Sequence, residues 1–364
     1  MDVSAVRAEL PVLERYAYLN AGTNGPLPRR AAEAMQRVLE SDLTEGRSSK
    51  PYFEGLLAQR EELRAALARV LRAPVEGVAL ATSTTEGCNV VITGLGIGPG
   101  DEVVTTDSEH PGLFGGLLTS GAEVRAVELR ARPAAGALEA LDAAITPRTR
   151  LIAVSHVSWL TGAVFPVREL AGRGIPVLVD GAQAAGTIPV DVAELGCDFY
   201  TVSAQKWLLG PDVTGALYVH PDWREKLRMT IPSYASWDWE AEERYVAKNT
   251  AARFDPGWIP AASVAGLLEA LAFAEELGDE RFDRARTATE RCRELLAQRF
   301  EVVSEPGQGT LVTWQAEGDS AEAVLKLADA GVVVRDLPGY RWLRASCGFW
   351  TSDDDLERLL AALG

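Results

Sequence analysis

"VLVDGAQAAGTIPVDVAELGCDFYTVSAQKWLLGP", residues 177–211, decides the fold. The segment holds two uninterrupted apolar runs, one ending at Asp180 and one at Ser203, and such runs are typical of strands covered on both faces. Lys206 follows the second run and precedes Trp207 and two leucines. A hydrated ammonium is costly to bury unless it is paired or chemically changed. The stretch therefore predicts two buried strands and a lysine with a chemical role.

Apolar segments of the same kind recur on either side of this stretch, between about residues 78 and 220. They alternate with helical patterns at 84–95 and 111–121. The other expected strands are "GVALATS", "DEVVTTD", "AEVRAVEL", "RLIAVSH" and "GALYVH". This alternation favours an α/β fold in which helices cover both faces of a large, mostly parallel sheet. Ligands of such sheets bind at the carboxyl ends of the strands.

The pattern changes after about residue 250. Amphipathic helices are expected at 263–278, 283–300 and 351–364, the last with a Ser or Thr cap before acidic residues. The strand-like segments of this part are 300–306, 309–316, 331–337 and 341–350. We therefore expect a large α/β domain at residues 15–250, and a smaller α+β domain built from residues 1–14 and 251–364.

The composition of the chain argues against several classes of protein. Of the 364 residues, 47% are hydrophobic and 24% are charged, as in soluble globular proteins. A formal net charge of −16 argues against binding to nucleic acid or to an anionic membrane surface. No apolar run predicts a membrane span or a signal peptide. The four cysteines lie far apart without a metal-binding spacing, so the expected compartment is a reducing cytoplasm.

Polar residues follow several of the expected strands. Thr84 and Thr85 open a helix, where they either cap it or help free N–H groups to hold a phosphate. His110 follows another strand, as a structural hydrogen-bonding group or as a functional ring. Asp180, with Gln183 beyond it, is either a turn cap or a buried anion. Together with a lysine, these residues are the parts of a site for pyridoxal phosphate (PLP).

The segment at 177–219 resembles the class V aminotransferase superfamily, which includes cysteine desulfurases, cystine C–S lyases and isopenicillin N epimerase-like enzymes. The resemblance rests on the D-x-A-Q motif at Asp180, on the interval from there to Lys206, and on "KWLLGP". It extends from "YLNAGTNGPLP" at 18–28 to "RASCGFW" near the C-terminus. It implies a PLP-dependent enzyme of fold type I, whose large domain has a mostly parallel, seven-stranded sheet.

The resemblance also implies a role for each polar residue. Lys206 is expected to form a Schiff base with PLP, Asp180 to bind the ring nitrogen, and Gln183 to form a hydrogen bond with the ring hydroxyl. His110 is expected to stack on the ring and to share in catalysis with the lysine and the aspartate. The expected phosphate ligands are Thr84, Thr85, Ser203 and Gln205, although many relatives carry histidine at the last of these positions.

The substrate side of the site is expected in "RDLPGYRWLRAS", residues 335–346. By resemblance, Arg344 binds the α-carboxylate of the substrate, a task that suits a two-pronged guanidinium. Arg335 is either a surface arginine or a ligand for a second carboxylate. Trp159, where desulfurases have asparagine, is expected to cover the cofactor pocket. Asn20 is expected to contact the substrate.

No cysteine lies between the two arginines, whereas desulfurases of this superfamily carry a nucleophilic cysteine on a loop there. Cys347 lies beyond them in an apolar segment and is expected in the core. The expected function is therefore a PLP-dependent C–S lyase that acts by β-elimination on cystine or a related sulfur amino acid, giving pyruvate, ammonia and a sulfur product. The alternatives are an amino-acid epimerase, a sulfoxide lyase, a desulfurase, and a binding protein that has lost its cofactor.

Two aromatic segments predict that the chain pairs with a copy of itself. "FDPGWIPAAS" at 254–263 matches a segment that reaches the neighbouring subunit's phosphate in relatives, although they usually have threonine near Trp258. "SYASWDWE" at 233–240 offers aromatic anchors of the kind enriched at interfaces. We expect a cytoplasmic homodimer that binds a small amino acid, with no metal, nucleic-acid or membrane partner.

Overall fold

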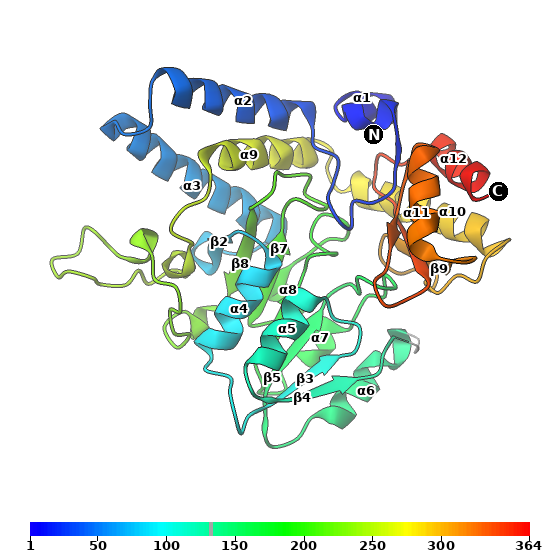
Figure 1. Cartoon of the computed structure of the whole chain (residues 1–364). Coiled ribbons are helices and arrows are strands. Elements are labelled where there is room, and N and C mark those ends of the chain that lie inside the picture. The colour runs from blue at the N-terminus through cyan, green and yellow to red at the C-terminus, as the bar shows by residue number, and fades with distance from the viewer. Residues whose placement is uncertain (131–133) are drawn as a thin grey trace.

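The computed structural model describes residues 1–130 and 134–364, and a seven-stranded sheet forms its centre (Figure 1). From one edge to the other, the strands are Val78–Ala81 (β2), Gly215–Val219 (β8), Phe199–Ser203 (β7), Val177–Asp180 (β6), Thr149–Ser155 (β5), Glu102–Thr106 (β3) and Glu123–Val127 (β4). Neighbouring strands are parallel except at β8, which runs antiparallel to β2 and β7. The predicted α/β fold with a large, mostly parallel sheet is confirmed.

Alternate residues of each central strand face two different cores. In β5, Ile152 and Val154 pack into one core while Leu151 and Ala153 pack into the other. All four side chains are fully buried, which explains why the central strands read as uninterrupted apolar runs. One core is completed by Lys50–Leu71 (α3), Ala137–Ala144 (α6), Val167–Leu170 (α7), Val192–Leu195 (α8) and Ala261–Glu276 (α9), and the other by Thr84–Gly94 (α4) and Pro111–Thr119 (α5).

A second unit packs beside the sheet and is called the C-terminal unit below. Its strands Leu311–Gln315 (β9), Trp342–Ser346 (β12) and Arg335–Asp336 (β11) form an antiparallel sheet, covered by Glu280–Ala297 (α10), Ser320–Asp329 (α11) and Asp353–Leu363 (α12). The predicted cap of the last helix is Ser352, whose side chain accepts a hydrogen bond from the N–H of Asp355. The orange and red ribbons of Figure 1 show this unit to one side of the central sheet.

Two of the predicted strands in this unit need correction. Residues 300–306 form only an isolated bridge, because the successive N–H groups of Val303 and Ser304 both point at the carbonyl of Thr313 and interrupt a regular ladder. Residues 331–337 divide into Val332–Val333 (β10) and β11, which pair with different strands. The side chains of this segment therefore serve two sheets rather than one.

The beginning of the chain is built into both units. After Val3–Ala8 (α1), the short strand Ala17–Tyr18 (β1) pairs in parallel with β10. Arg29–Thr44 (α2) then packs along α9, on the side of α9 that faces away from the large sheet (Figure 1). The division into a large domain at 15–250 and a small domain from the remainder stays a prediction. No helix in the described part of the chain is long and apolar enough to cross a membrane.

Candidate active site

A pocket of about 200 Å³ lies where the carboxyl ends of β6 and β7 meet the C-terminal unit. Its lining consists of Gly22, Thr23, Ser83, Thr84, Thr85, His110, Trp159, Gln183, Ser203, Gln205, Lys206, Arg335 and Arg344. The fold thus brings together every residue that the sequence predicted for the site, except that Asp180 and Asn20 are not in the lining. This edge of the sheet is also where ligands of open α/β sheets bind.

Lys206 lies in the turn that follows β7, and backbone hydrogen bonds fix this turn. The N–H of Gly25 donates to the carbonyl of Gln205 over 2.8 Å, so the turn is tied to the N-terminal part of the chain. Leu209 has a φ of 56°, a left-handed conformation that is uncommon outside glycine. The strained turn thus places Lys206 in the pocket wall, which agrees with a functional position rather than a simple strand end.

The surroundings of Lys206 change its acidity. Burial lowers the pKa of its amine to about 8, against the effect of the Asp180 carboxylate, while Arg344 and Arg335 act in the same direction as burial. Only a neutral amine can attack an aldehyde or accept a proton from carbon. With this pKa, an appreciable fraction of Lys206 is neutral near physiological pH.

Asp180 is the buried acid of the site, at the end of β6. Its Oδ1 accepts a hydrogen bond from the N–H of Ala182 over 2.9 Å. Burial raises the pKa of this carboxyl, and the positive charge of Lys206 opposes the shift. A buried carboxylate needs a cation nearby to stay ionised, so this position favours a positively charged group at the base of the pocket.

The amide of Gln183 joins three parts of the structure. Its Oε1 accepts a hydrogen bond from Nε1 of Trp207 over 2.8 Å, and its Nε2 donates to the carbonyl of Gly22 over 2.8 Å. Because an amide nitrogen carries two hydrogens, Nε2 has a second donor to offer a ligand in the pocket. The predicted contact with a ring hydroxyl is therefore compatible with the bonds that Gln183 already makes.

Helix α4 begins at the pocket and presents hydroxyl groups to it. Ser83 caps the helix by accepting a hydrogen bond from the N–H of Glu86 over 3.2 Å. The N–H of Thr84 donates to Oγ of Ser203 over 2.9 Å, and the two hydroxyl oxygens lie 3.1 Å apart. A helix N-terminus carries a partial positive charge, and hydroxyls beside it add donors, so this corner is suited to an anion such as a phosphate.

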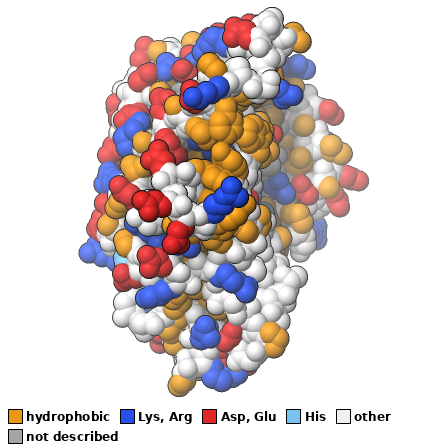
Figure 2. Space-filling model, turned by 90° about the vertical axis from the view of Figure 1, so that its left-hand side faces the viewer, with side chains coloured by type: hydrophobic (Ala, Val, Ile, Leu, Met, Phe, Trp, Pro, Cys, Tyr) orange, Lys and Arg blue, Asp and Glu red, His pale blue; other side chains and the backbone are white. Residues whose placement is uncertain are grey.

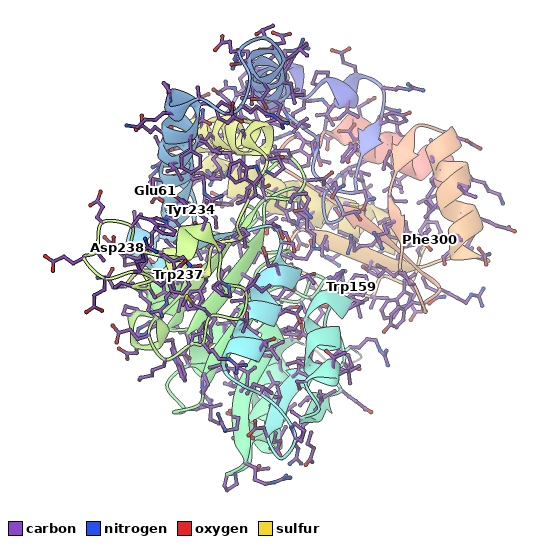
Figure 3. The ribbon with its side chains drawn as sticks, turned by 60° about the vertical axis from the view of Figure 1, so that its left-hand side comes forward. Glu61, Trp159, Tyr234, Trp237, Asp238 and Phe300 are labelled. Carbon is purple, nitrogen blue, oxygen red and sulfur yellow. The ribbon has the colours of Figure 1, made fainter. Side chains whose placement is uncertain are left out.

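His110 and Trp159 form an aromatic side of the pocket. Nδ1 of His110 accepts a hydrogen bond from the N–H of Gly112 over 3.0 Å, and the two rings meet edge to face with centroids 5.3 Å apart. Burial, helped by the charge of Lys206 and of the two arginines, lowers the pKa of His110 to about 4, so the imidazole stays neutral. Figure 3 shows Trp159 on the side of the sheet that faces the C-terminal unit.

Arg335 and Arg344 stand directly opposite each other in the β11–β12 hairpin, so both side chains lie on the same face. Nη1 of Arg344 donates to the carbonyl of Trp159 over 2.6 Å. Burial, together with the charge of Arg335, lowers the pKa of Arg344 to about 9. Within the described residues, no carboxylate lies within 4.0 Å of either guanidinium. The hairpin therefore carries a concentrated positive charge that calls for anionic groups on a ligand.

Asn20 lies beside the pocket rather than in its lining. Its Oδ1 accepts a hydrogen bond from the hydroxyl of Thr23 over 2.9 Å, and the same hydroxyl oxygen accepts one from Nη1 of Arg335 over 3.1 Å. Asn20 thus reaches the arginine through Thr23. Its direct contact with a substrate stays a prediction.

Three lining residues were not anticipated from the sequence: Gly22, Thr23 and Ser83. A Cβ at Gly22 would lie 2.8 Å from Nη2 of Arg344 and 2.9 Å from Oγ of Ser346, so only glycine leaves room there. The two glycines in "NAGTNG" are the one sequence signal that is typical of such a close approach.

Unpaired polar atoms gather at this pocket. Among the described residues, none bonds to the following buried atoms: Nε1 of Trp159, Oε1 of Gln205, Nε of Arg335, Nε of Arg344 and Oγ of Ser346. Buried polar groups are normally paired, so these atoms indicate a polar ligand. The lysine amine, the buried acid, the neutral imidazole and the helix N-terminus match the aldehyde, the ring nitrogen, the ring face and the phosphate of PLP. The residues present therefore fit this cofactor.

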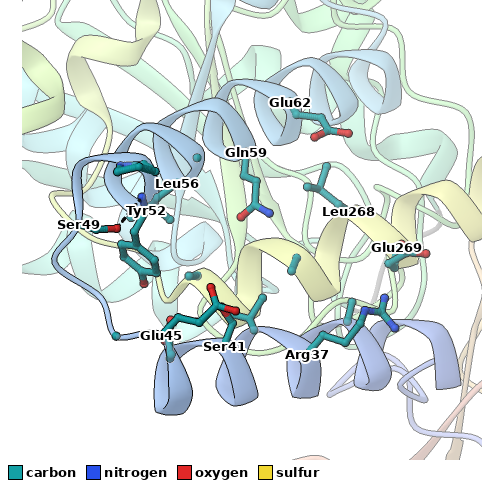
Figure 4. A pocket seen from close by; sticks show the side chains of 18 residues that line it. Arg37, Ser41, Glu45, Ser49, Tyr52, Leu56, Gln59, Glu62, Leu268 and Glu269 are labelled. Carbon is teal, nitrogen blue, oxygen red and sulfur yellow. Dashed lines mark hydrogen bonds between the residues drawn. The ribbon is translucent and has the colours of Figure 1, made fainter.

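A larger pocket, of about 650 Å³, lies between α2, α3 and α9, away from these residues (Figure 4). Its charged lining includes Arg37, Glu45, Glu62 and Glu269. None of its lining residues is a lysine, a histidine or a cysteine, so it offers no amine, imidazole or thiol for catalysis. The chemistry belongs to the smaller pocket.

Comparisons with known proteins show the family of this chain. Residues 17–356 match the family model described as aminotransferase class-V. Isopenicillin N epimerase from Streptomyces clavuligerus is 30% identical, covering 95% of this chain and 93% of its own. A probable cysteine desulfurase from Methanothermobacter thermautotrophicus is 29% identical over 78% of this chain and 73% of its own. The solved complex of the cystine C–S lyase C-DES with its reaction product cysteine persulfide has a TM-score of 0.92 at 28% identity, covering 97% of this chain and 98% of that one. The chain belongs to the aminotransferase class-V family, as predicted.

Proposed function

We propose that this class-V enzyme is a PLP-dependent C–S lyase that cleaves cystine, or a closely related disulfide amino acid, by β-elimination. With cystine, one Cβ–S bond breaks and both sulfur atoms leave together as cysteine persulfide. The remaining three-carbon fragment takes up one water and gives pyruvate and ammonia. The atoms balance without an external oxidant or reductant.

The observation that carries this proposal is the pair of opposed arginines in a hairpin that has no thiol. A desulfurase needs an accessible cysteine thiolate to accept sulfur. All four cysteines of this chain are buried. A hydrogen bond with Cys292, together with burial, raises the pKa of the Cys347 thiol well above its usual range. Elimination needs no such acceptor, because the sulfur leaves with the product.

We assign the proton transfers to two residues. PLP, when bound, supplies an electron sink conjugated to the substrate Cα. Lys206 Nζ takes the α-proton, since a pKa near 8 keeps a neutral amine within reach of physiological pH. The buried carboxylate of Asp180 holds the proton on the pyridine nitrogen, because an anion in this apolar position needs a cationic partner.

We assign the binding of the substrate to the other side of the pocket. Arg344 binds the α-carboxylate with its two-pronged guanidinium, and its bond to the Trp159 carbonyl holds it in place. Arg335 stands opposite and binds a second carboxylate, which cystine carries on its departing half. Trp159 and His110 cover the reacting atoms and exclude water from them.

An epimerase is the second candidate, because the curated relative from Streptomyces clavuligerus covers nearly the whole chain. Both reactions begin when a base removes the α-proton. An epimerase then returns a proton to the opposite face of Cα, whereas a lyase expels the β-substituent. A disulfide substrate offers a good leaving group at Cβ, and this favours elimination.

The test is a substrate profile of the purified PLP-loaded enzyme in deuterated water. L-cystine, L-cysteine and an S-alkylcysteine sulfoxide are supplied separately, and pyruvate, ammonia, alanine and the configuration at Cα are measured. We expect pyruvate and ammonia in equal amounts, released in step with persulfide, and fastest from cystine. Alanine in place of pyruvate would indicate a desulfurase. Inversion at Cα with deuterium uptake and no pyruvate would indicate an epimerase, and preference for the sulfoxide would indicate a sulfoxide lyase.

We further propose that the enzyme works as a cytoplasmic homodimer. Figure 2 shows hydrophobic side chains gathered in a band across one face. Large aromatic side chains are exposed near the predicted contact segments: Trp239, Tyr245 and Trp258 are 54%, 64% and 60% exposed. Aromatic residues are enriched in interfaces, which supports a self-association that buries them. Light scattering at micromolar concentration tests this proposal, and an active monomer would refute it.

A further inference from the structure

Residues 20–25 form a loop between the turn that holds Lys206 and the β11–β12 hairpin. This loop is called the N-terminal loop below. The N–H of Gly25 donates a hydrogen bond to the carbonyl of Gln205, next to Lys206. The carbonyl of Gly22 accepts a hydrogen bond from Nε2 of Gln183. Thr23 lies in the same loop, lines the pocket, and contacts the hairpin through Arg335. The loop is therefore in contact with both sides of the pocket at once.

Arg335 has few protein groups that hold it. The structure gives its guanidinium one side-chain hydrogen bond, from Nη1 to the hydroxyl oxygen of Thr23, over 3.1 Å. Its Nε is buried without a partner among the described residues. Arg344 stands opposite with the same charge, so the two guanidinium groups repel each other. Among the described residues, Thr23 is the side chain whose hydrogen bond holds the Arg335 guanidinium in place.

The hydroxyl group of Thr23 donates one hydrogen bond and accepts another, and these directions fix its orientation toward Arg335. A threonine hydroxyl has one hydrogen, and Asn20 Oδ1 accepts it over 2.9 Å. The oxygen of Thr23 is then left with lone pairs only, which is the state that can accept from Arg335. Asn20 thus orients Thr23, and Thr23 in turn orients the arginine.

We propose that Thr23 is a positioning residue that fixes the Arg335 guanidinium apart from Arg344, and so gives the pocket its preference for substrates with two carboxylates. This inference rests on the proposed function. It assigns the selection of the second carboxylate to a neutral hydroxyl in the N-terminal loop, which itself touches no reacting atom. A valine at this position keeps the shape of threonine but cannot accept the hydrogen bond. A serine keeps the bond and loses only a methyl group.

The test compares two disulfide substrates that differ in one carboxylate. Cystine carries two, whereas S-(2-aminoethylthio)-L-cysteine carries one, keeps the distal ammonium of cystine and likewise loses its leaving group as a persulfide. For Thr23→Val we expect the KM for cystine to rise about 10-fold, since hydrogen bonds to charged groups contribute on this scale. The kcat for cystine should stay within about twofold, as should both constants for the monocarboxylate, because Arg344 and Lys206 are untouched.

Two further variants complete the test. Thr23→Ser should restore the KM for cystine to within about twofold of the original, because the hydroxyl returns. Thr289→Val removes a buried threonine hydroxyl from α10, where it bonds to the Ala285 carbonyl, and it should leave both substrates unaffected. Equal losses on the two substrates, or a failure of serine to rescue, would overturn the inference.

Failure of the proposed function can be told apart from failure of this inference. If the wild-type enzyme cleaves neither disulfide, binding is measured through the absorbance of the bound cofactor instead. The ligands are then L-2-aminoadipate, which has two carboxylates, and L-norleucine, which has one. Thr23→Val should weaken binding of the first about 10-fold and of the second less than about twofold. Equal dissociation constants in wild type and variant would reject the role of Thr23.

Discussion

The pocket has a sheet wall, made of residues that follow the central strands, and a hairpin wall, made of Arg335 and Arg344. The two walls differ in how many of their buried polar atoms have hydrogen-bond partners. On the sheet wall, the N–H of Thr84 donates to the hydroxyl oxygen of Ser203. The side-chain amide of Gln183 is bonded to the Gly22 carbonyl and to the Trp207 ring. On the hairpin wall, Arg335 and Arg344 each keep a buried Nε without a partner in the described residues, and they carry like charges. The first wall leaves Oε1 of Gln205 unpaired among the described residues, and the second leaves the Nε atoms of both its arginines unpaired.

This difference separates the part of the pocket that fits a cofactor from the part that fits an anionic substrate. A preorganised wall positions one cofactor and would look similar for many reactions of that cofactor. A cationic wall with unpaired donors favours molecules that bring matching anions, so under the proposed function it would select the substrate. Changes in the sheet wall should therefore remove catalysis altogether, whereas changes in the hairpin wall should alter which substrates react.

The largest expected effect comes from the sheet wall. Lys206→Ala should lower turnover of cystine by at least about 10³-fold, because the proposed base and the attachment point of the cofactor are both lost. The measurement is pyruvate formation, with circular dichroism to confirm folding. Lys226→Ala, at an exposed lysine on the surface, is the matched control and should keep full activity. Retention of activity without Lys206 would remove the basis for a PLP mechanism.

A smaller effect is expected from the hairpin wall. Arg344→Lys should lower kcat/KM for cystine about 10- to 100-fold, because an ammonium cannot reproduce the two-pronged hold on a carboxylate. Arg341→Lys changes an exposed arginine of the same hairpin and should leave kcat/KM unchanged. Steady-state kinetics on both variants decides the matter, and equal rates for the two would mean that Arg344 does not hold the substrate.

Beneath the sheet wall, His156 should make stability depend on pH. Its Nδ1 lies 2.9 Å from the Tyr200 hydroxyl, and burial lowers its pKa to about 4 from an ordinary 6.5. The unfolded chain therefore binds more protons between these values, so His156 stabilises the fold above pH 6.5 and progressively less as pH falls to 4. The full effect is roughly 3 kcal/mol.

The experiment compares urea unfolding of wild type and His156→Gln at pH 7 and pH 4.5. Glutamine can still bond to Tyr200 but does not titrate, so the variant should lose less stability on acidification. Glu109 acts in the opposite direction, since burial raises its pKa to about 7, but this contribution is common to both proteins and cancels. Identical pH slopes would show that His156 is not held neutral.

The smallest effect is expected at Cys347. Because this thiol is buried in the core of the C-terminal unit, Cys347→Ala should cost about 1 kcal/mol of stability and keep turnover within about threefold. Chemical unfolding and pyruvate formation measure the two quantities. Loss of activity in the folded variant, together with alanine as product, would move the assignment to a desulfurase.

Most of the central sheet could be predicted from the sequence, because strands buried on both faces have uninterrupted apolar runs. The residues at the ends of these strands followed, since the carboxyl ends of parallel strands meet at one edge. The reversed direction of β8 does not follow from the apolar run at 215–219 itself, and the signal for it is the short, helix-free connection 204–214, which is too short for a typical parallel crossover. The apolar run at 331–337 likewise does not reveal its division between two partners.

The contribution of the N-terminal loop was harder to predict. Thr23 and Gly22 stand in a turn-like sequence, and a threonine in a turn usually bonds to its own backbone. What gives Thr23 a different role is Arg335, which only the folded hairpin brings within reach. Asn20 was singled out from the sequence, but its neighbour carries the contact with the pocket.

Backbone pairing joins the start of the chain to its end, through the bridge between Asn20 and Ser346 and the pairing of Ala17 with Val332. These pairs can form only after nearly the whole chain has been synthesised. The N-terminal loop leaves the ribosome early, but its partners are among the last residues translated. The large sheet is complete once residue 219 has emerged, and contacts between distant parts of a chain close slowly. A newly made chain therefore contains Lys206 and the sheet that carries it well before it contains Arg335 and Arg344.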